Sequence, residues 1–313
     1  IAFVIGGSFV FSCRVIVLSP SILRLMTTPV YLMAYSLLYL RLYFVGMMCI
    51  FIYNIGSGIL RAVGDSNNPL YFLIFCCFCN IFLDLLLVMV FRMGVMGVAL
   101  GTLISQALSS LLVLRSLMRT RDIYRLELRK IRLHSAPLSM LLKIGLPSGL
   151  QSTMYNIANM VIQTALNSFG TDTMAAWTAF GKVDSFYWMI SSAFGVAITT
   201  FVGQNYGAGK IDRCKKTMFL CLIEDFIASA VAIALVLLTG KYILAFFSCD
   251  PEVIAIGYTR LLFLVGSYIF TLTYEILSGY LRGFGISLAP AILTLFGVCG
   301  VRIFWIKAIF PMH

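Results

Sequence analysis

Long apolar runs recur along this chain and constrain its fold more than any other feature. Nine of them, each of roughly 20 residues, are long enough to cross a lipid bilayer as α-helices. They lie at 1–18, 38–60, 69–91, 95–117, 144–168, 174–202, 217–239, 257–280 and 288–310. Of the 313 residues, 61% are hydrophobic and only 11% are charged, whereas soluble domains are roughly 25% charged. The sequence therefore predicts an all-α protein that crosses a membrane many times.

Lys and Arg are distributed unevenly between the segments that join these helices. The segment 115–143 holds eight of them against two acids, and the loop after residue 202 holds four. The loop 169–173 holds none, and the loop 240–257 holds only Lys241. Cytoplasmic loops of membrane proteins collect Lys and Arg. The alternation therefore fits nine crossings, with the segment 115–143 and the loop after residue 202 in the cytoplasm. The net charge of +11 has the same explanation, so we expect contact with membrane lipid and no nucleic-acid partner.

One motif occurs in both halves of the chain. GILRAVGDSNNP at 58–69 and GYLRGFGISLAP at 279–290 share the pattern G-x-L-R-x-x-G-x-x-x-x-P, 221 residues apart, and Tyr53 and Tyr274 keep the same offset. Both copies end an apolar run on the predicted cytoplasmic side, which indicates a parallel repeat about an axis along the membrane normal. The sequence thus predicts two pseudo-symmetric helix bundles. These comprise a first lobe at 1–118, a basic cytoplasmic linker at 119–139 and a second lobe at 140–313.

The cysteines and histidines do not form a pattern that binds metal. Most of the nine Cys lie in apolar runs, no pair of C-x-x-C motifs is present, and there are two His. We expect these Cys to pack as small hydrophobic residues, and we expect no metal and no cofactor. The chain begins at Ile1 within an apolar run, and we interpret it as truncated at both ends.

A carboxylate stands inside one of the apolar runs. In IFCCFCNIFLDLLLVMVF, residues 74–91, Asn80 precedes Asp84 by four positions, which stacks both on one face of a helix. An ionised Asp at bilayer depth costs on the order of 3 kcal/mol or more. Such a group faces water, takes up a proton or binds a cation, and Asn80 supplies a second oxygen ligand. The alternative is a hydrogen bond within the bundle.

Several motifs, in the same order, resemble the multidrug and toxic compound extrusion (MATE) transporters. They are FVGQNYGAGKIDRCKK at 201–216, IGLPSGLQ at 144–151, GILRAVGDSNNP at 58–69, NIFLD at 80–84 and GVMGVALGTLISQ at 94–106. The resemblance implies twelve helices in two lobes of six, of which this chain covers helices three to eleven. It also implies a monomeric, multi-pass protein of the plasma membrane, the inner membrane in a bacterium.

This resemblance implies a function in transport and not in catalysis. Its members are secondary antiporters that export organic, often cationic and drug-like, compounds in exchange for H⁺ or Na⁺ by alternating access. The substrate occupies the cleft between the lobes. A lipid-linked oligosaccharide flippase of the same superfamily is the alternative, although Lys182 and Arg302 are the only obvious cations for a pyrophosphate. No DDxxD run or HExxH motif supports an intramembrane enzyme.

The resemblance also implies a set of coupling residues in the first lobe. One branch of the family has a cation site there on helices one, four, five and six. The helix-five pattern falls on Asn80 and Asp84, the helix-six Thr falls on Thr102, and helix four offers Asn54 or Ser57. The first helix of the family lies outside this sequence.

Charged residues also occur inside the predicted helices of the second lobe. The family has an acid on helix ten near the position of Thr271, and Glu275 lies one turn further on. Glu275, Asp184 and Lys182 are the candidates for second-lobe coupling or substrate contact. Lys182 and Asp184, two positions apart, should point to different sides of their helix.

We expect these charged groups to find partners on other helices. Glu224 or Asp225 could supply a partner for Lys182, with the lining of a cavity as an equal alternative, and Arg302 could pair with Glu275. Arg61 and Arg282, in the repeated motif, are expected to cap helix ends or reach lipid headgroups.

Amides line the helix that opens the second lobe. Gln151, Asn156, Asn159, Gln163 and Asn167 follow one another at spacings of 5, 3, 4 and 4, which we interpret as roughly one face. The first four are the candidate residues of a substrate cleft, and hydrogen bonding between helices is the alternative.

Overall fold

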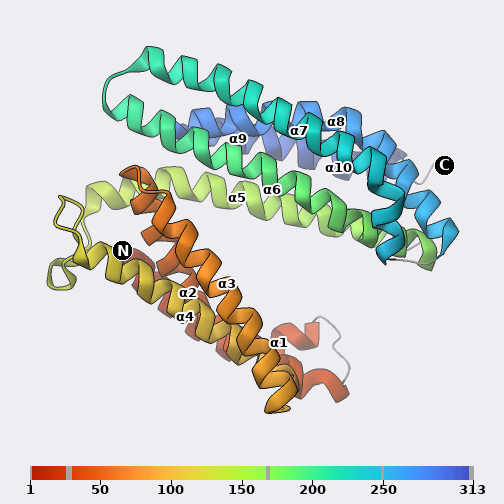
Figure 1. Ribbon diagram of the computed structural model, residues 1–313, viewed down its shortest axis with the longest axis horizontal. Helices are drawn as coiled ribbons and strands as arrows, with labels where there is room; N and C mark the ends of the chain where they lie inside the picture. Colours follow the sequence, from red (N-terminus) through yellow and green to blue (C-terminus); the bar gives the residue numbers. More distant parts are fainter. Residues whose placement is uncertain (1, 26–29, 167–169, 248–249, 310–313) are drawn as a thin grey trace. The chain divides into compact units, whose positions relative to one another are not determined.

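The computed structural model describes residues 2–25, 30–166, 170–247 and 250–309, and this part of the chain is almost entirely helical (Figure 1). The α-helices are α1 (Ala2–Leu25), α2 (Val30–Ala62), α3 (Asn67–Leu85), α4 (Gly94–Arg119), α5 (Ser135–Leu166), α6 (Thr171–Gly207), α7 (Ile211–Phe247), α8 (Pro251–Gly283), α9 (Leu288–Leu293) and α10 (Val301–Phe304). π-helical segments at Leu86–Val90, Thr294–Gly300 and Trp305–Ile309 extend α3, α9 and α10, and Leu128–Lys130 is a 3₁₀ turn. The predicted fold class is confirmed.

Eight helical segments of the described residues are long and apolar enough to cross a membrane, and they include every long helix except α5. A helix does form at the position predicted for α5, over Ser135–Leu166. Its amide and hydroxyl side chains lower its hydropathy, which separates it from the other eight. Hydropathy therefore identifies eight of the nine predicted crossings among the described residues.

The chain divides into two compact units, Ile1–Leu138 and Ser139–His313. The basic segment after α4 belongs to the first unit because it folds back on that helix. The Leu126 amide donates a hydrogen bond of 2.9 Å to the Leu117 carbonyl. Tyr124 and Leu126 pack against a buried cluster of Leu60, Val113 and Leu117. In the same segment, a hydrogen bond from Lys130 lowers the pKa of the Glu127 carboxyl, 2.8 Å away.

Helix α4 forms the centre of the first unit, where it packs against both α2 and α3. Its buried face is a row of small residues four positions apart, namely Gly97, Gly101, Ser105 and Ser109. Small residues at this spacing allow helix backbones to approach closely in a membrane. At Gly97, an added Cβ would lie 3.1 Å from the Leu87 carbonyl carbon, so the close approach of α3 and α4 requires glycine there.

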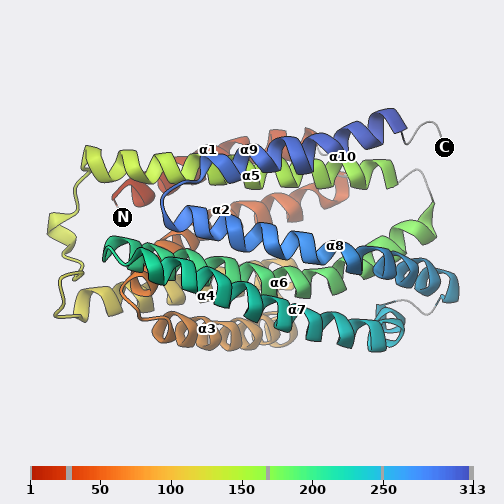
Figure 2. The same cartoon turned by 90° about the horizontal axis from the view of Figure 1, so that it is seen from above.

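Helix α6 has the corresponding place in the second unit, with α7 and α8 packed against it (Figure 1). One apolar cluster joins Phe180 and Val183 of α6 to Leu244 of α7 and Leu261 of α8. A second lies further along the same three helices and includes Ile198, Cys221 and Ile276. Figure 2 shows α5 running beside the α9–α10 segment in this unit.

The repeated motif folds in the same way in both units. The Tyr53 hydroxyl donates to the Pro69 carbonyl at 2.9 Å, and the Tyr274 hydroxyl donates to the Pro290 carbonyl at 3.2 Å. Each preceding helix ends at a glycine with positive φ, +94° at Gly64 and +81° at Gly285, a conformation that favours glycine. The two copies therefore form the same helix–turn–helix structure, in which a tyrosine of the first helix bonds the start of the second.

Candidate ion-coupling site

Asp84 lies on α3 and is half-buried against α4. The Asn80 amide, one turn earlier, donates to Asp84 Oδ1 at 3.4 Å, as the spacing of four predicted. A Cβ added at Gly101 of α4 would overlap this same oxygen and lie 3.4 Å from the Asp84 carboxyl carbon. The carboxylate therefore points into the seam between α3 and α4. No Lys or Arg of the described residues lies within 4.0 Å of it.

The backbone changes its hydrogen bonding immediately after Asp84. The α-helix ends at Leu85, and Leu86–Val90 continues as a π-helical turn, with the Phe91 amide bonded to the Leu86 carbonyl at 3.1 Å. π-helical turns occur frequently at functional sites because their insertion widens the helix and shifts the side chains that follow. The turn ends at Arg92, whose φ is +53°.

The other predicted members of the first-unit site lie on α4 and α2. Thr102 is half-buried and lines a pocket between these two helices with Tyr39, Tyr43 and Gln106. Asn54 is exposed and its amide donates to the Ile50 carbonyl of its own helix at 2.9 Å. Ser57 is fully buried, and its hydroxyl has no hydrogen-bond partner in the described part of the chain. None of these three hydroxyl or amide groups is hydrogen-bonded to Asp84, so the structure assembles only Asn80, Asp84 and Gly101.

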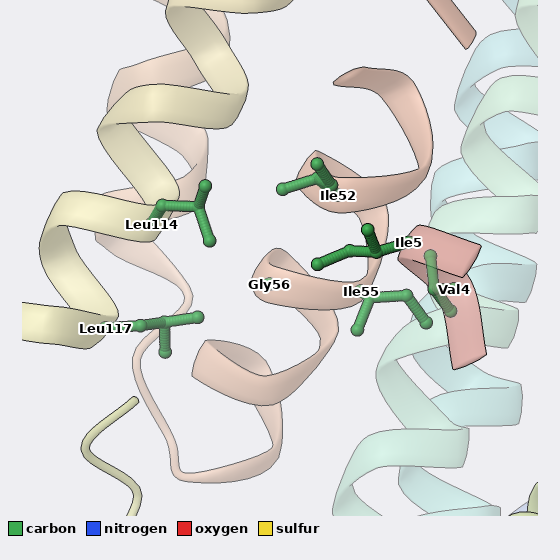
Figure 3. A pocket seen from close by; sticks show the side chains of 7 residues that line it. All are labelled: Val4, Ile5, Ile52, Ile55, Gly56, Leu114 and Leu117. Carbon is green, nitrogen blue, oxygen red and sulfur yellow. The ribbon is translucent and has the colours of Figure 1, made fainter. Parts of the chain in front are cut away.

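A second pocket in the first unit is lined entirely by apolar side chains (Figure 3). Its walls come from α1, α2 and α4: Val4, Ile5, Ile52, Ile55, Gly56, Leu114 and Leu117. Leu114 is thirteen residues beyond Gly101, about 20 Å along α4. With no polar side chain, this pocket offers no ligand for an ion.

Glu275 repeats the arrangement of Asp84 in the second unit. A Cβ added at Gly195 of α6 would lie 2.8 Å from Glu275 Oε1, so this carboxylate also rests on a glycine of the neighbouring helix. Unlike Asp84, Glu275 is paired with a cation, because Arg282 Nη2 lies 2.8 Å from Oε1. The predicted pairing of Glu275 with Arg302 is wrong, since Arg302 donates to Asn159 Oδ1 at 3.2 Å. Arg282 lies two turns after Glu275 on the same face of α8, so this ion pair forms within one helix.

Lys182 and Asp184 point to different sides of α6, as their spacing predicted. Lys182 is exposed and pairs with neither Glu224 nor Asp225, so the predicted pairing is wrong. Asp184 accepts a short hydrogen bond from the Tyr268 hydroxyl of α8.

The α5 amides divide into different environments instead of sharing one face. Gln151 is buried and donates to the Tyr274 hydroxyl at 2.8 Å and to Thr294 Oγ1 at 3.0 Å. Asn159 is exposed and accepts from Arg302, Asn156 is exposed, and Gln163 is half-buried. At 100° per residue, Gln151 and Asn156 are about 140° apart, which explains the division. Asn167 lies outside the described residues.

Sequence reasoning missed a row of ionisable side chains along α8. Arg260, Tyr268, Glu275 and Arg282 follow at spacings of 8, 7 and 7 and so share one face. The Arg260 guanidinium lies 3.0 Å from the centre of the Trp177 ring of α6, and the Tyr268 ring stacks on Tyr187 with 3.9 Å between centres. The repeated spacing of seven residues was the signal in the sequence that these polar side chains line one face of the helix.

Comparison with known proteins shows which family the chain resembles. The MatE family model matches residues 1–86 and 147–305. Two proteins of Bacillus subtilis (strain 168) named probable multidrug resistance proteins are similar to the chain. YpnP is 30% identical over 290 residues, which covers 93% of this chain and 65% of that protein. YoeA is 28% identical over 290 residues, which covers 90% of this chain and 62% of that protein.

The chain thus spans less than two thirds of the length of these two relatives. Among solved structures, a MOP superfamily transporter from Pyrococcus furiosus has the same fold. It superimposes with a TM-score of 0.88 over 97% of this chain and 70% of its own, at 21% identity. The apolar helices make the chain a multi-pass membrane protein. By the extent of the family match, the chain belongs to the MatE family.

Proposed function

We propose that the chain is the core of a secondary antiporter that exports small organic compounds in exchange for H⁺ or Na⁺, with Asp84 as the coupling group. The observation that carries this proposal is a carboxylate, within a helix of membrane-spanning length, that has no cationic partner among the described residues. The names of the Bacillus relatives, which refer to multidrug resistance, support organic compounds as the substrates.

The physical basis for coupling is the cost of an unpaired charge. An ionised carboxylate at bilayer depth costs on the order of 3 kcal/mol, and one weak hydrogen bond from Asn80 offsets only part of this. A proton or a bound cation removes the penalty, so occupancy of Asp84 changes the stability of the α3–α4 seam. A conformational equilibrium that exposes Asp84 to the two sides of the membrane in turn is then biased by the ion gradient.

The seam has features suited to such a change. Gly101 leaves room for the carboxylate between the two helices, which a Cβ at that position would fill. The π-helical turn that follows Asp84 is a kind of segment that is frequent at functional sites. The ion-binding group is therefore adjacent to an irregular part of the backbone.

The cationic side chains of the second unit disfavour a flippase for pyrophosphate-linked lipids. Arg282 is paired with Glu275, Arg302 is bonded to Asn159, and Arg260 is stacked on Trp177. Lys182 is exposed but is a single charge. We therefore propose neither an enzyme nor a flippase, and no cofactor other than the coupling ion.

The test is transport in membrane vesicles with an imposed ion gradient and a fluorescent organic cation. Asp84→Asn keeps the size of the neutral acid but cannot take up a proton and has no negative charge with which to hold a cation. We expect gradient-driven export to fall to background while the amount of protein in the membrane is unchanged. The matched control is Asp122→Asn, in the linker outside the helices, which should transport normally. Wild-type export by Asp84→Asn would contradict the coupling role.

A further inference from the structure

Asp225 of α7 is the one acidic side chain among the described residues that is fully buried, with 0% of its surface exposed. Its Oδ1 accepts a hydrogen bond of 3.3 Å from the Ser229 hydroxyl, one turn further along α7. Its Oδ2 has no hydrogen-bond partner in the described part of the chain. Neither the coupling site at Asp84 nor the predicted pair with Lys182 accounts for this group.

Two contacts between α7 and α6 show which part of α6 lies beside Asp225. Cys214 Sγ contacts the Val202 carbonyl at 3.7 Å, and Cys221 Sγ contacts the Phe194 carbonyl at 3.9 Å. A step of seven residues along α7 thus matches a step of eight back along α6, which places Asp225 level with residues 189–190 of α6, beside Ser191. The Ser191 hydroxyl is also fully buried and without a hydrogen-bond partner in the described residues.

Tyr187, one turn before Ser191 on α6, lies within reach of Ser229 and of the Asp225 charge. Its hydroxyl donates to the Tyr268 carbonyl at 2.7 Å, so it does not supply a proton to Asp225. Asp184, one turn earlier still, is occupied by the Tyr268 hydroxyl. Glu224, beside Asp225 on α7, is exposed.

The charged groups that α8 brings to this level do not neutralise Asp225. Glu275 is close enough for its charge to act on Asp225, and it holds Arg282 in an ion pair of 2.8 Å. Arg260 lies over Trp177, and no basic side chain of the described residues is within 4.0 Å of Asp225. Of these two neighbouring acids, only Glu275 forms an ion pair with Arg282.

We propose that Asp225 is a second ion-binding group of this protein, in the second unit, and that the ion it binds is a proton. A buried carboxylate with one long hydrogen bond and a like charge nearby is not stable as an anion. The neutral acid needs one acceptor for its hydroxyl, and the Ser229 oxygen, 3.3 Å from Oδ1, can provide it. A metal cation would need several oxygen ligands, and among the described residues only the Ser229 hydroxyl is hydrogen-bonded to the carboxylate.

This proposal does not depend on Asp84 being the coupling group. The proton on Asp225 leaves Glu275 as the single negative charge opposite Arg282, so the buried α6–α7–α8 seam is neutral. If Arg282 moved away, Glu275 would need a proton of its own. The protonation of Asp225 therefore determines the net charge around the Glu275–Arg282 ion pair.

Infrared spectroscopy of the whole chain in lipid nanodiscs tests the proposal. A protonated carboxyl group gives a carbonyl stretch that an ionised one lacks. The parent for this test is Asp84→Asn, which removes the unpaired membrane carboxyl of the first unit. We expect the parent to show the protonated band at mildly acidic pH, and Asp225→Asn in that parent to lack it. Glu224→Gln, the adjacent exposed acid, is the matched control and should keep the band.

Either of two results would overturn the proposal. The first is a parent spectrum that is unchanged by Asp225→Asn, and the second is loss of the band when sodium is added at constant pH. If Asp225→Asn does not fold, isotope-labelled aspartate in the parent replaces it. A band that does not shift with labelled aspartate then overturns the proposal, whereas a shifted band supports it.

Discussion

At the scale of single residues, the site of Asp84 is defined as much by an absent side chain as by a present one. A methyl group at Gly101 would overlap Asp84 Oδ1, so Gly101→Ala must displace either the carboxylate or the helix. Overpacking of this kind costs about 1–3 kcal/mol, and we expect a lower unfolding midpoint for Gly101→Ala in thermal unfolding. Gly58→Ala, on α2 with nothing within 4 Å of the added Cβ, is the control and should melt like the wild type. Equal midpoints for the two variants would contradict the close contact.

The burial of Asp225 makes a second prediction at this scale. A group that keeps its proton in the folded protein releases it on unfolding at any pH above the pKa of an unfolded Asp, about 3.9, so its contribution to stability decreases as the pH rises from there. We expect the stability of the wild type to decrease from acidic to neutral pH more than that of Asp225→Asn, in chemical unfolding monitored by tryptophan fluorescence. Parallel pH profiles for the two proteins would indicate an acid that ionises in the folded state.

Residue contacts within one helix could be predicted from the sequence, and contacts between helices could not. The spacing of four residues correctly predicted that Asn80 lies next to Asp84, because helical periodicity alone determines which residues of one helix are neighbours. The partner of Glu275 was predicted as Arg302 but is Arg282. Which residues meet across helices depends on the rotation and depth of each helix, which hydropathy does not determine.

At the scale of helices, α6 and α8 approach so closely that glycine is required at their contact. A Cβ at Gly279 would lie 2.6 Å from both the Gly195 carbonyl oxygen and Ile198 Cγ2, and Thr199 Oγ1 donates to the Gly279 carbonyl at 3.0 Å. We expect Gly279→Ala to destabilise the protein by about 1–3 kcal/mol, measured by unfolding in detergent micelles. The control is Gly266→Ala on the same helix, which has nothing within 4 Å. A neutral Gly279→Ala would show that the two helices are not held in contact there.

The positions of the helices followed from hydropathy, but their lengths did not. The apolar run at 217–239 is the middle of α7, which extends over Ile211–Phe247. Hydropathy measures the part of a helix that lies in hydrocarbon, whereas backbone hydrogen bonding continues into the flanking polar residues until a glycine or proline ends it. The π-helical segment after Asp84 had no signal in the sequence, since its residues are as apolar as those of any spanning helix.

At the scale of the whole molecule, the membrane topology depends on whether α5 crosses the bilayer. Three hydrogen bonds connect α5 to the α9–α10 segment: Ser287 to the Lys143 carbonyl, Gln151 to Thr294, and Arg302 to Asn159. They are distributed over sixteen residues of α5, about 24 Å, and the paired residues advance together in sequence, so the two segments run parallel. Leu288–Ala308 is long and apolar enough to span a membrane. We infer that α5 spans beside it, with its amides satisfied by helix contacts.

This inference makes a topological prediction that cysteine labelling can check. With α5 as a crossing, six crossings separate Ser66 from Ile286, and the two turns of the repeated motif lie on the same side of the membrane. Without it, five crossings separate them and they lie on opposite sides. Single cysteines at these exposed positions, in a background without other cysteines, should both react with a membrane-impermeant maleimide from the cytoplasmic side. A cysteine at Tyr242, which is 80% exposed near the far end of α7, should react only from the other side. Labelling of positions 66 and 286 from opposite sides would mean that α5 does not cross, and the parallel repeat would then be excluded.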